Sequence, residues 1–264
     1  MATTFDISNF IVDRVLRGVA LSHTDGSVLF SINQITNPQI TVNSESTDAV
    51  DALGVPIQTF YRAKNAELSC ENALFDINLM AVQSGSTKQV ATTEKKIVTP
   101  AFETIDIDGT SVTYTLKHTP NTSPERIYYL KGDSTLGQVY TKGTKADATT
   151  FAITDNILTP PTELAAGDQL FVIYEYEATQ AVSVVNSAQN FPTGCEFILE
   201  VLGTDVCDST KLIYAYLIFP NFKLSPDFDW TVSTDSTHSF SGKAQQEYCS
   251  KDKKLFQLIV PGDE

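Results

Sequence analysis

The sequence has few of the residues on which metal centres and acid–base catalysts depend. It contains four cysteines and three histidines in 264 residues, with no Cys-x-x-Cys pair and no histidine at metal-ligand spacing. This argues against a zinc site and predicts free thiols at Cys70, Cys195, Cys207 and Cys249. Gly-x-Ser-x-Gly and glycine-rich phosphate-binding motifs are also absent. We therefore expect no cofactor, no metal and no enzymatic activity.

Paired carboxylates are present, but turn chemistry explains them. Such pairs can serve glycoside hydrolysis or bind calcium. Here the aspartates fall where turns or loops are expected, and the glutamates form one polar face of a strand. The pairs are Asp106/Asp108, Asp205/Asp208, Asp227/Asp229 and Glu175/Glu177. His118 alternates onto the apolar face of its predicted strand, where a structural histidine is the commoner case.

Basic residues are scarce as well. The chain has 18 Lys and Arg against 32 Asp and Glu, which gives a net charge of −14. Proteins that grip nucleic acid concentrate Lys and Arg, so no tight nucleic-acid-binding surface is expected. An acidic surface keeps a protein soluble, and it also lets DNA slide past without sticking.

Long apolar runs are missing too. The longest, residues 212–220 (LIYAYLIFP), is far shorter than the ~20 residues that a membrane-spanning helix needs. The first residues, MATTFDISNFIVD, have neither the basic nor the apolar region of a secretion signal. We expect a protein without membrane contact that is made and kept in a cytoplasm.

What the sequence does have is β-forming residues, including fifteen phenylalanines and ten tyrosines. Alternating segments at residues 28–32 and 40–42 predict two early strands, with a turn at Asn37-Pro38. Residues 43–55 predict a long acidic loop, and residues 56–71 resume an extended pattern. The fold class is therefore mainly β.

One helix is predicted, over residues 72–83 (NALFDINLMAVQ). Asn72 suits the N-cap, Ile77 and Ala81 recur at helical spacing, and Gly85 follows the end. The helix is apolar over so much of its circumference that it requires cover on more than one side.

The middle of the chain has a different texture. Between Pro100 and Ala181, short strand-like segments alternate with Gly, Pro and Asn, and Asp108-Gly109 is a two-residue hairpin signal. Several strands at this spacing predict a small sandwich. We therefore divide the chain into a core, residues 1–99 and 182–264, and an inserted β subdomain, residues 100–181.

The last third returns to long strands. In residues 212–219 both alternating sets of side chains are apolar, which predicts a strand that is buried on both faces. Further strands are expected at residues 228–235 and at residues 254–261 (KLFQLIVP). A strand so close to the last residue is an aggregation hazard unless something covers its edge.

Two stretches carry a resemblance to a known family. They are residues 59–85 (TFYRAKNAELSCENALFDINLMAVQSG) and residues 218–249 (IFPNFKLSPDFDWTVSTDSTHSFSGKAQQEYC). In order and texture they resemble the major tail tube proteins of long-tailed bacteriophages and related contractile particles. The resemblance covers residues 1–99 and 182–264, and implies a tail-tube-like β-sandwich or barrel with one flanking helix. Residues 100–181 then resemble the immunoglobulin-like insertions that such virion proteins often carry.

The resemblance also implies a function. The chain would be a virion structural protein, assembled in the host cytoplasm into stacked hexameric rings that form the channel for DNA ejection. Its partners would be further copies of the chain, other tail proteins, and DNA as non-specific cargo. Edge-to-edge pairing around a closed ring would remove free sheet edges. The expected subunit interface is Tyr214, Tyr216, Phe219, Leu255 and Leu258, and the expected inter-ring loop carries Glu45, Asp48 and Asp51.

Two alternatives stay open at this point. A phage head-decoration or coat subunit would share the β-rich composition and the lack of catalytic motifs. A carbohydrate-binding or hydrolytic β-sandwich would instead show an exposed aromatic platform near paired carboxylates.

Overall fold

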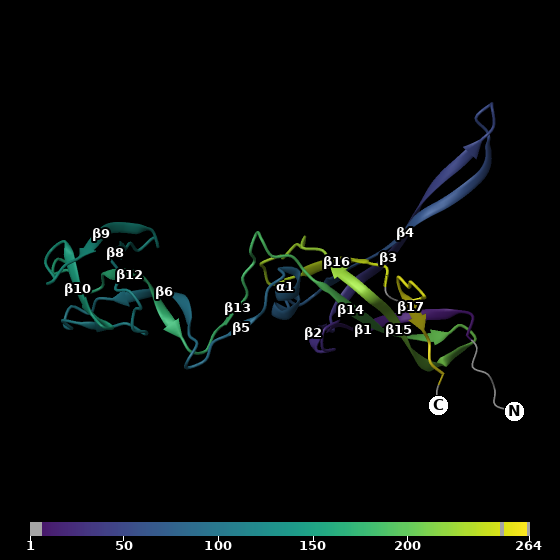
Figure 1. Ribbon diagram of the computed structural model, residues 1–264. Helices are drawn as coiled ribbons and strands as arrows, with labels where there is room; N and C mark the ends of the chain where they lie inside the picture. The colour runs from purple at the N-terminus through teal and green to yellow at the C-terminus, as the bar shows by residue number, and fades with distance from the viewer. Residues whose placement is uncertain (1–6, 249–250, 263–264) are drawn as a thin grey trace. The chain divides into compact units, whose positions relative to one another are not determined.

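The computed structural model describes residues 7–248 and 251–262, and within them the chain is mainly β, which confirms the predicted fold class. The chain divides into two compact units (Figure 1). One contains the residues up to Lys88 together with those from Val184 onward, and the other is Gln89–Ser183. Pro100, the expected start of the insertion, lies inside a strand of the second unit and pairs with Glu175. Each unit has its own hydrophobic core.

The first unit is built on one nearly closed, barrel-like sheet. Its strands follow the order β2-β1-β14-β15-β16-β4-β3, and β17 also pairs with β15. The bounds are β1 Phe10–Ser22, β2 Val28–Ile32, β3 Ile35–Val50, β4 Pro56–Asn72, β14 Gly194–Asp205, β15 Asp208–Leu224, β16 His238–Ala244 and β17 Gln257–Ile259.

Aromatic side chains from several strands fill this barrel. Phe197 and Phe219 pair across β14 and β15, and both are fully buried. Phe30 and Phe222 pack against Phe197, with ring centroids 5.9 Å and 5.3 Å away. Rings of this size contribute most of the apolar area that a core buries. Gly242 allows β16 to pass this cluster, because a Cβ there would collide with the ring of Phe222.

The helix begins later than the sequence indicates. α1 spans Ile77–Gln83, and its N-cap is Asp76, whose carboxylate accepts a hydrogen bond from the Leu79 backbone nitrogen at 2.7 Å. The predicted start at Asn72 is wrong, because β4 stays paired with β16 as far as that residue. Gly85 follows the helix with a φ of +59°, the conformation expected just past a helix end.

The C-terminal third also departs from the prediction. Residues 228–235 hold only an isolated bridge from Trp230 to His238, and residues 254–261 contain just the three residues of β17. Between them, β16 occupies a polar segment that was not expected to form a strand. Its alternate residues, among them His238 and Phe240, are buried, so one face joins the core.

The second unit contains a seven-stranded sheet in the order β6-β12-β8-β9-β10-β11-β7 and a two-stranded sheet of β5 and β13. Its core gathers around the fully buried Phe151, Ile127 and Leu170. The bounds are β5 Gln89–Val90, β6 Ile97–Asp106, β7 Tyr114–Thr115, β8 Arg126–Leu130, β9 Leu136–Lys142, β10 Thr150–Thr154, β11 Ile157–Thr159, β12 Gln169–Ala178 and β13 Val182–Ser183.

Asp108-Gly109 forms a turn but not the predicted two-residue hairpin, because β6 pairs with β12 whereas β7 pairs with β11. The Asp108 carboxylate accepts hydrogen bonds from the Ser111 hydroxyl and from the backbone nitrogens of Ser111 and Thr110. These bonds hold the pKa of Asp108 well below its usual range. The aspartate is therefore a turn-forming residue, as its sequence position indicates.

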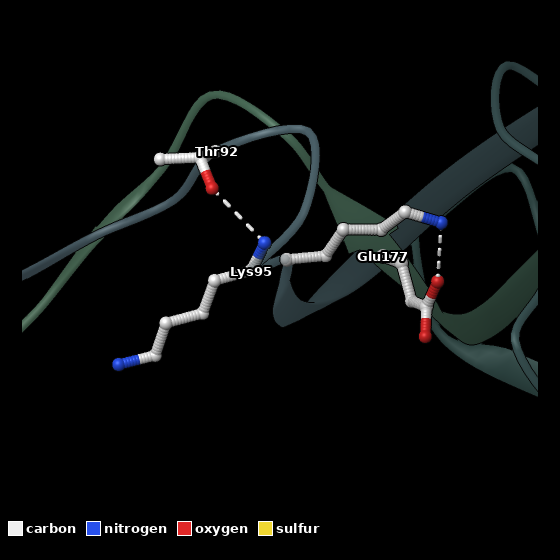
Figure 2. A network of polar contacts seen from close by, with 4 residues as sticks. Thr92, Lys95 and Glu177 are labelled. Atoms are coloured by element: carbon white, nitrogen blue, oxygen red, sulfur yellow. Dashed lines mark hydrogen bonds and ion pairs between the residues drawn. The ribbon is translucent and has the colours of Figure 1, made fainter.

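Polar contacts stabilise the segment that joins β5 to β6. The Lys95 backbone nitrogen donates to the Thr92 hydroxyl at 2.9 Å, and the Lys96 ammonium lies 2.7 Å from the Glu177 carboxylate (Figure 2). Both members of that ion pair are partly exposed, so its contribution to stability is small. No helix in the described residues is both long and apolar enough to cross a membrane.

Candidate assembly surface

A long β-hairpin projects from the sheet of the first unit (Figure 1). β3 and β4 pair from Ile35 and Asn72 at the base to Val50 and Pro56 near the turn. Almost every residue of segment 43–65, which we call the arm, is exposed. The predicted loop over residues 43–55 is therefore wrong. Both faces of the arm are solvated, so residues 43–50 lack the alternation of apolar and polar residues that signals a strand.

Three register shifts interrupt this hairpin, and two of them place two residues of one strand opposite one residue of the other. Asn37 and Pro38 stand opposite Cys70, and Ala63 and Lys64 stand opposite residue 44. Asn37 and Ala63 have φ angles of +50° and +48°, which bulges favour but non-glycine residues rarely adopt. Pro38 is tolerated because β3 is the last strand in the sheet order. Asn37-Pro38 thus marks a bulge and not the predicted turn.

Asp51 builds the turn at the end of the arm. Its carboxylate accepts hydrogen bonds from the backbone nitrogens of Leu53 and Val55, both at 2.9 Å. Gly54 completes the turn with a φ of +83°. The sequence pattern alone did not indicate these two hydrogen bonds. Asp51 shapes the element that carries it.

The other two acidic residues expected to lie between rings are on β3. Glu45 pairs opposite Arg62 and Asp48 opposite Thr59, and both glutamate and aspartate are exposed. Because side chains alternate along a strand, Glu45 and Asp48 lie on opposite faces of the arm. The structure thus places all three acidic residues on one projecting element.

Apolar side chains gather at the end of the arm, which the sequence reading did not single out. Leu53 is 88% exposed, and Val55, Ile57 and Tyr61 are each more than half exposed. Complete burial of one such side chain stabilises a contact by about 1.5–3 kcal/mol. A cluster of this kind marks a surface for association. The sequence signal that could have revealed this cluster is the group of apolar residues on either side of Gly54, namely Leu53, Val55 and Ile57.

β15 presents a second apolar surface. Leu217 and Phe219 point into the core, whereas Leu212 and Tyr214 on the other face are 58% and 48% exposed. The prediction of a strand buried on both faces is wrong for the single chain, because the barrel core covers only one face. Phe219 is fully buried and so is not available to a neighbour, while Tyr216 is half-buried on the open face.

The remaining predicted interface residues are close to the C-terminal end of the chain. Leu258 in β17 pairs opposite Leu217 and is exposed, whereas Leu255 packs half-buried against the core. β17 reaches only residues 216–218 of β15, and among the described strands none pairs with that edge at residues 211–215. Such an edge offers unpaired backbone groups to another strand.

Metal-ligating and nucleophilic side chains contribute little to either surface. No group of three or more His, Cys, Asp or Glu in the described residues is placed to hold a metal ion. Cys70 and Cys195 are buried and free, and burial raises the pKa of both thiols, so they stay protonated. Cys207 is free and exposed, and Cys249 lies outside the described residues.

Comparison with protein-family models finds a match. The model of the YomU/Tube protein family matches residues 10–255, a span that reaches into both units and includes the arm and β15. No curated protein matches the chain.

Proposed function

The chain belongs to the YomU/Tube protein family, and we propose that it is a bacteriophage tail tube subunit that assembles into stacked hexameric rings. The observation that carries this proposal is the exposed arm, which projects from a barrel-like sheet and ends in apolar side chains. A monomer gains nothing from displaying Leu53 to water, whereas a contact between copies buries it.

Within a ring, we assign the subunit contact to the open side of β15. Leu212, Tyr214 and Tyr216 supply apolar area, Leu258 lies beside them, and residues 211–215 supply an unpaired edge. A neighbouring copy that adds a strand there satisfies the backbone groups, and closure of the ring leaves no edge free. Leu255 supports this surface from its position against the core.

Between rings, we assign the contact to the arm. Glu45, Asp48 and Asp51 lie along the same element as the apolar cluster at its end. The apolar residues supply the attraction, and the acidic residues keep the free arm soluble.

The net charge of −14 suits the transport of DNA. An acidic lumen repels phosphates and lets the genome slide during ejection. We further propose that Gln89–Ser183 is an immunoglobulin-like insertion on the outside of the tube, and that other tail proteins join the ends of the tube in the virion.

Electron microscopy and light scattering of the purified full-length chain test this proposal. We expect hexameric rings and tubes. Leu53→Ser should leave rings but shorten or abolish tubes, whereas Val112→Ser, at a 77% exposed valine of the second unit, should change neither. Monomers or trimers at every concentration would contradict the proposal and favour a head-decoration or coat subunit.

A further inference from the structure

A polar cleft of about 490 Å³ opens on the second unit. One wall is the segment 117–121, which follows β7, and the other is formed by Lys96, just before β6, and by the end of β12. The side chains that matter here are those of Lys96, Lys117, His118, Asn121, Tyr176 and Glu177.

Two stacked rings line this cleft. The imidazole of His118 lies parallel to the phenol ring of Tyr176, with centroids 3.8 Å apart and an interplanar angle of 3°. His118 is exposed, contrary to the expectation that it faces a strand's apolar side, and Tyr176 is half-buried. Tyr176 thus fixes the imidazole plane, and the uncovered face of His118 is open to a ligand.

A buried carboxylate holds the backbone of the cleft segment. Glu103 is only 6% exposed, and it accepts hydrogen bonds from the Lys117 backbone nitrogen, at 3.0 Å, and from the Tyr174 hydroxyl. The Tyr174 oxygen accepts in turn from the His118 backbone nitrogen at 3.1 Å. Burial of a carboxylate costs free energy. Here the hydrogen bonds of the buried Glu103 and of Tyr174 offset this cost. They fix the backbone of Lys117 and His118, whose side chains line the cleft.

The segment is also fixed at its other end. The Asn121 backbone nitrogen donates to the Glu175 carbonyl at 2.7 Å. A segment fixed at both ends loses little conformational entropy when a ligand binds, which strengthens binding. A connection that only joined two strands would not need this support.

The charged groups of the cleft differ in their partners. Lys96 is paired with Glu177, whereas Lys117 makes no ion pair among the described residues. Lys117 therefore remains available to an anionic group, and the Lys96–Glu177 pair and Asn121 offer both donors and acceptors to neutral hydroxyls.

We propose that this cleft binds an acidic saccharide. A sugar ring places its flat C–H face on His118, its hydroxyls bond to Asn121 and to the Lys96–Glu177 pair, and its acidic substituent meets Lys117. The acid is a carboxylate or a phosphate, because a lysine ammonium attracts both. This inference does not depend on tube assembly.

Saturation-transfer NMR with the full-length chain tests the inference. The probes are a hyaluronan tetrasaccharide, which carries uronate groups, chitotetraose, a neutral tetrasaccharide that shares its N-acetylglucosamine units, and glycerol 3-phosphate as a competitor. We expect the uronate probe to bind more tightly than the neutral one. If glycerol 3-phosphate competes with the uronate probe, the site also accepts phosphate-bearing saccharides. If it does not compete, the site accepts uronates alone.

Variants locate the binding. His118→Ala should weaken binding of the uronate probe about tenfold, because it removes the stacking face. Lys117→Gln should weaken the uronate probe and leave chitotetraose unchanged. The matched controls are His23→Ala and Lys131→Gln, which are exposed and outside the cleft. If the wild-type chain does not bind the uronate probe, the proposal is overturned. It is also overturned if His118→Ala, with thermal unfolding unchanged, binds the probe as tightly as the wild-type chain.

Discussion

At the scale of single residues, position on a strand decides whether an aromatic side chain stabilises the fold or faces solvent. Tyr214 and Phe219 are both apolar members of β15, yet Tyr214 is half-exposed and Phe219 is fully buried. They are five residues apart, so strand alternation sends them to opposite faces. The same substitution should therefore have different consequences at the two positions.

Tyr214→Asp should block assembly and leave the fold of the subunit intact. A carboxylate at residue 214 stays hydrated in the free chain but loses water in a contact between copies, which costs several kcal/mol. Phe219→Asp, its matched control, should unfold the first unit. Thermal unfolding together with microscopy measures both effects. Loss of the monomer fold in Tyr214→Asp would place residue 214 in the core instead.

His238 carries a second prediction at this scale. The imidazole is buried, stacks on Phe75, and lies with Nε2 2.8 Å from the Gln83 side-chain oxygen. Burial lowers its pKa below the ordinary value of 6.5, although the nearby Asp76 carboxylate opposes this. The folded state therefore holds a neutral His238 at a pH where the unfolded chain takes up a proton.

The first unit should lose stability as the pH falls below 6.5. The contribution of His238 to the free energy of unfolding is complete above the pKa of the unfolded chain. As the pH falls below that pKa, this free energy decreases by up to ~1.4 kcal/mol per pH unit, until the lowered pKa of the folded state is reached. Urea unfolding between pH 8 and pH 5 measures this through Trp230, the single tryptophan, which stacks on Phe75 at 4.1 Å. His238→Asn should show a flatter profile, and identical profiles would contradict the assignment.

At the scale of elements, the arm is stabilised by local contacts. It has no core of its own, so its order depends on the ladder between β3 and β4 and on the turn that Asp51 builds. An isolated two-stranded hairpin is only marginally stable in water. The end of the arm is therefore sensitive to the loss of a single turn contact.

Asp51→Ala should loosen the turn and reduce stacking of rings. It removes two hydrogen bonds, each worth about 0.5–1.5 kcal/mol. Asp48→Ala makes the same charge change at another exposed residue of the arm and is the matched control. Hydrogen exchange of the amides of residues 53–55 should accelerate only in Asp51→Ala. Equal effects of the two variants would show that charge, and not the turn, is what stacking requires.

At the scale of the whole molecule, the second unit enters and leaves the chain at one place. Gln89 pairs with Ser183 and Val90 with Val182 in the β5–β13 sheet. Chain ends that are already adjacent can be joined without disturbing the first unit, as domain insertions require. Because the predicted boundary at Pro100 lies within β6, a removal is better made at the β5–β13 pair.

Replacement of residues 91–181 by a short Gly-Ser bridge should preserve ring formation. Both assembly surfaces belong to the first unit, whose core contains no residue of the removed segment. Gel filtration and microscopy of the shortened chain measure the result. Insoluble protein, or a soluble protein without rings, would show that the second unit is needed for the first to fold or assemble.

Salt should promote assembly. The chain carries 32 acidic and 18 basic residues, so copies repel one another until ions screen their charge. The exposed apolar residues of the arm supply an attraction that screening does not weaken. Light scattering across a NaCl series measures the direction, and polymer that dissolves as salt rises would contradict it.

The sequence by itself determined the mainly β class and the body of α1, because these follow from composition and from the local periodicity of side chains. The family resemblance carried the prediction of a tube protein. The ring, the DNA channel and the immunoglobulin-like insertion remain predictions.

Only the tertiary structure decided which face of β15 is covered, that residues 43–55 join a hairpin, and that Glu103 supports a cleft. The periodicity of a sequence shows which side chains of a strand are apolar, but it does not show which other parts of the protein cover them. Backbone pairing leaves no alternating pattern in residues 43–50, because both faces of that strand segment are solvated. The partners of Glu103 come from β12 and from the segment before β8, and only the folded chain brings these together.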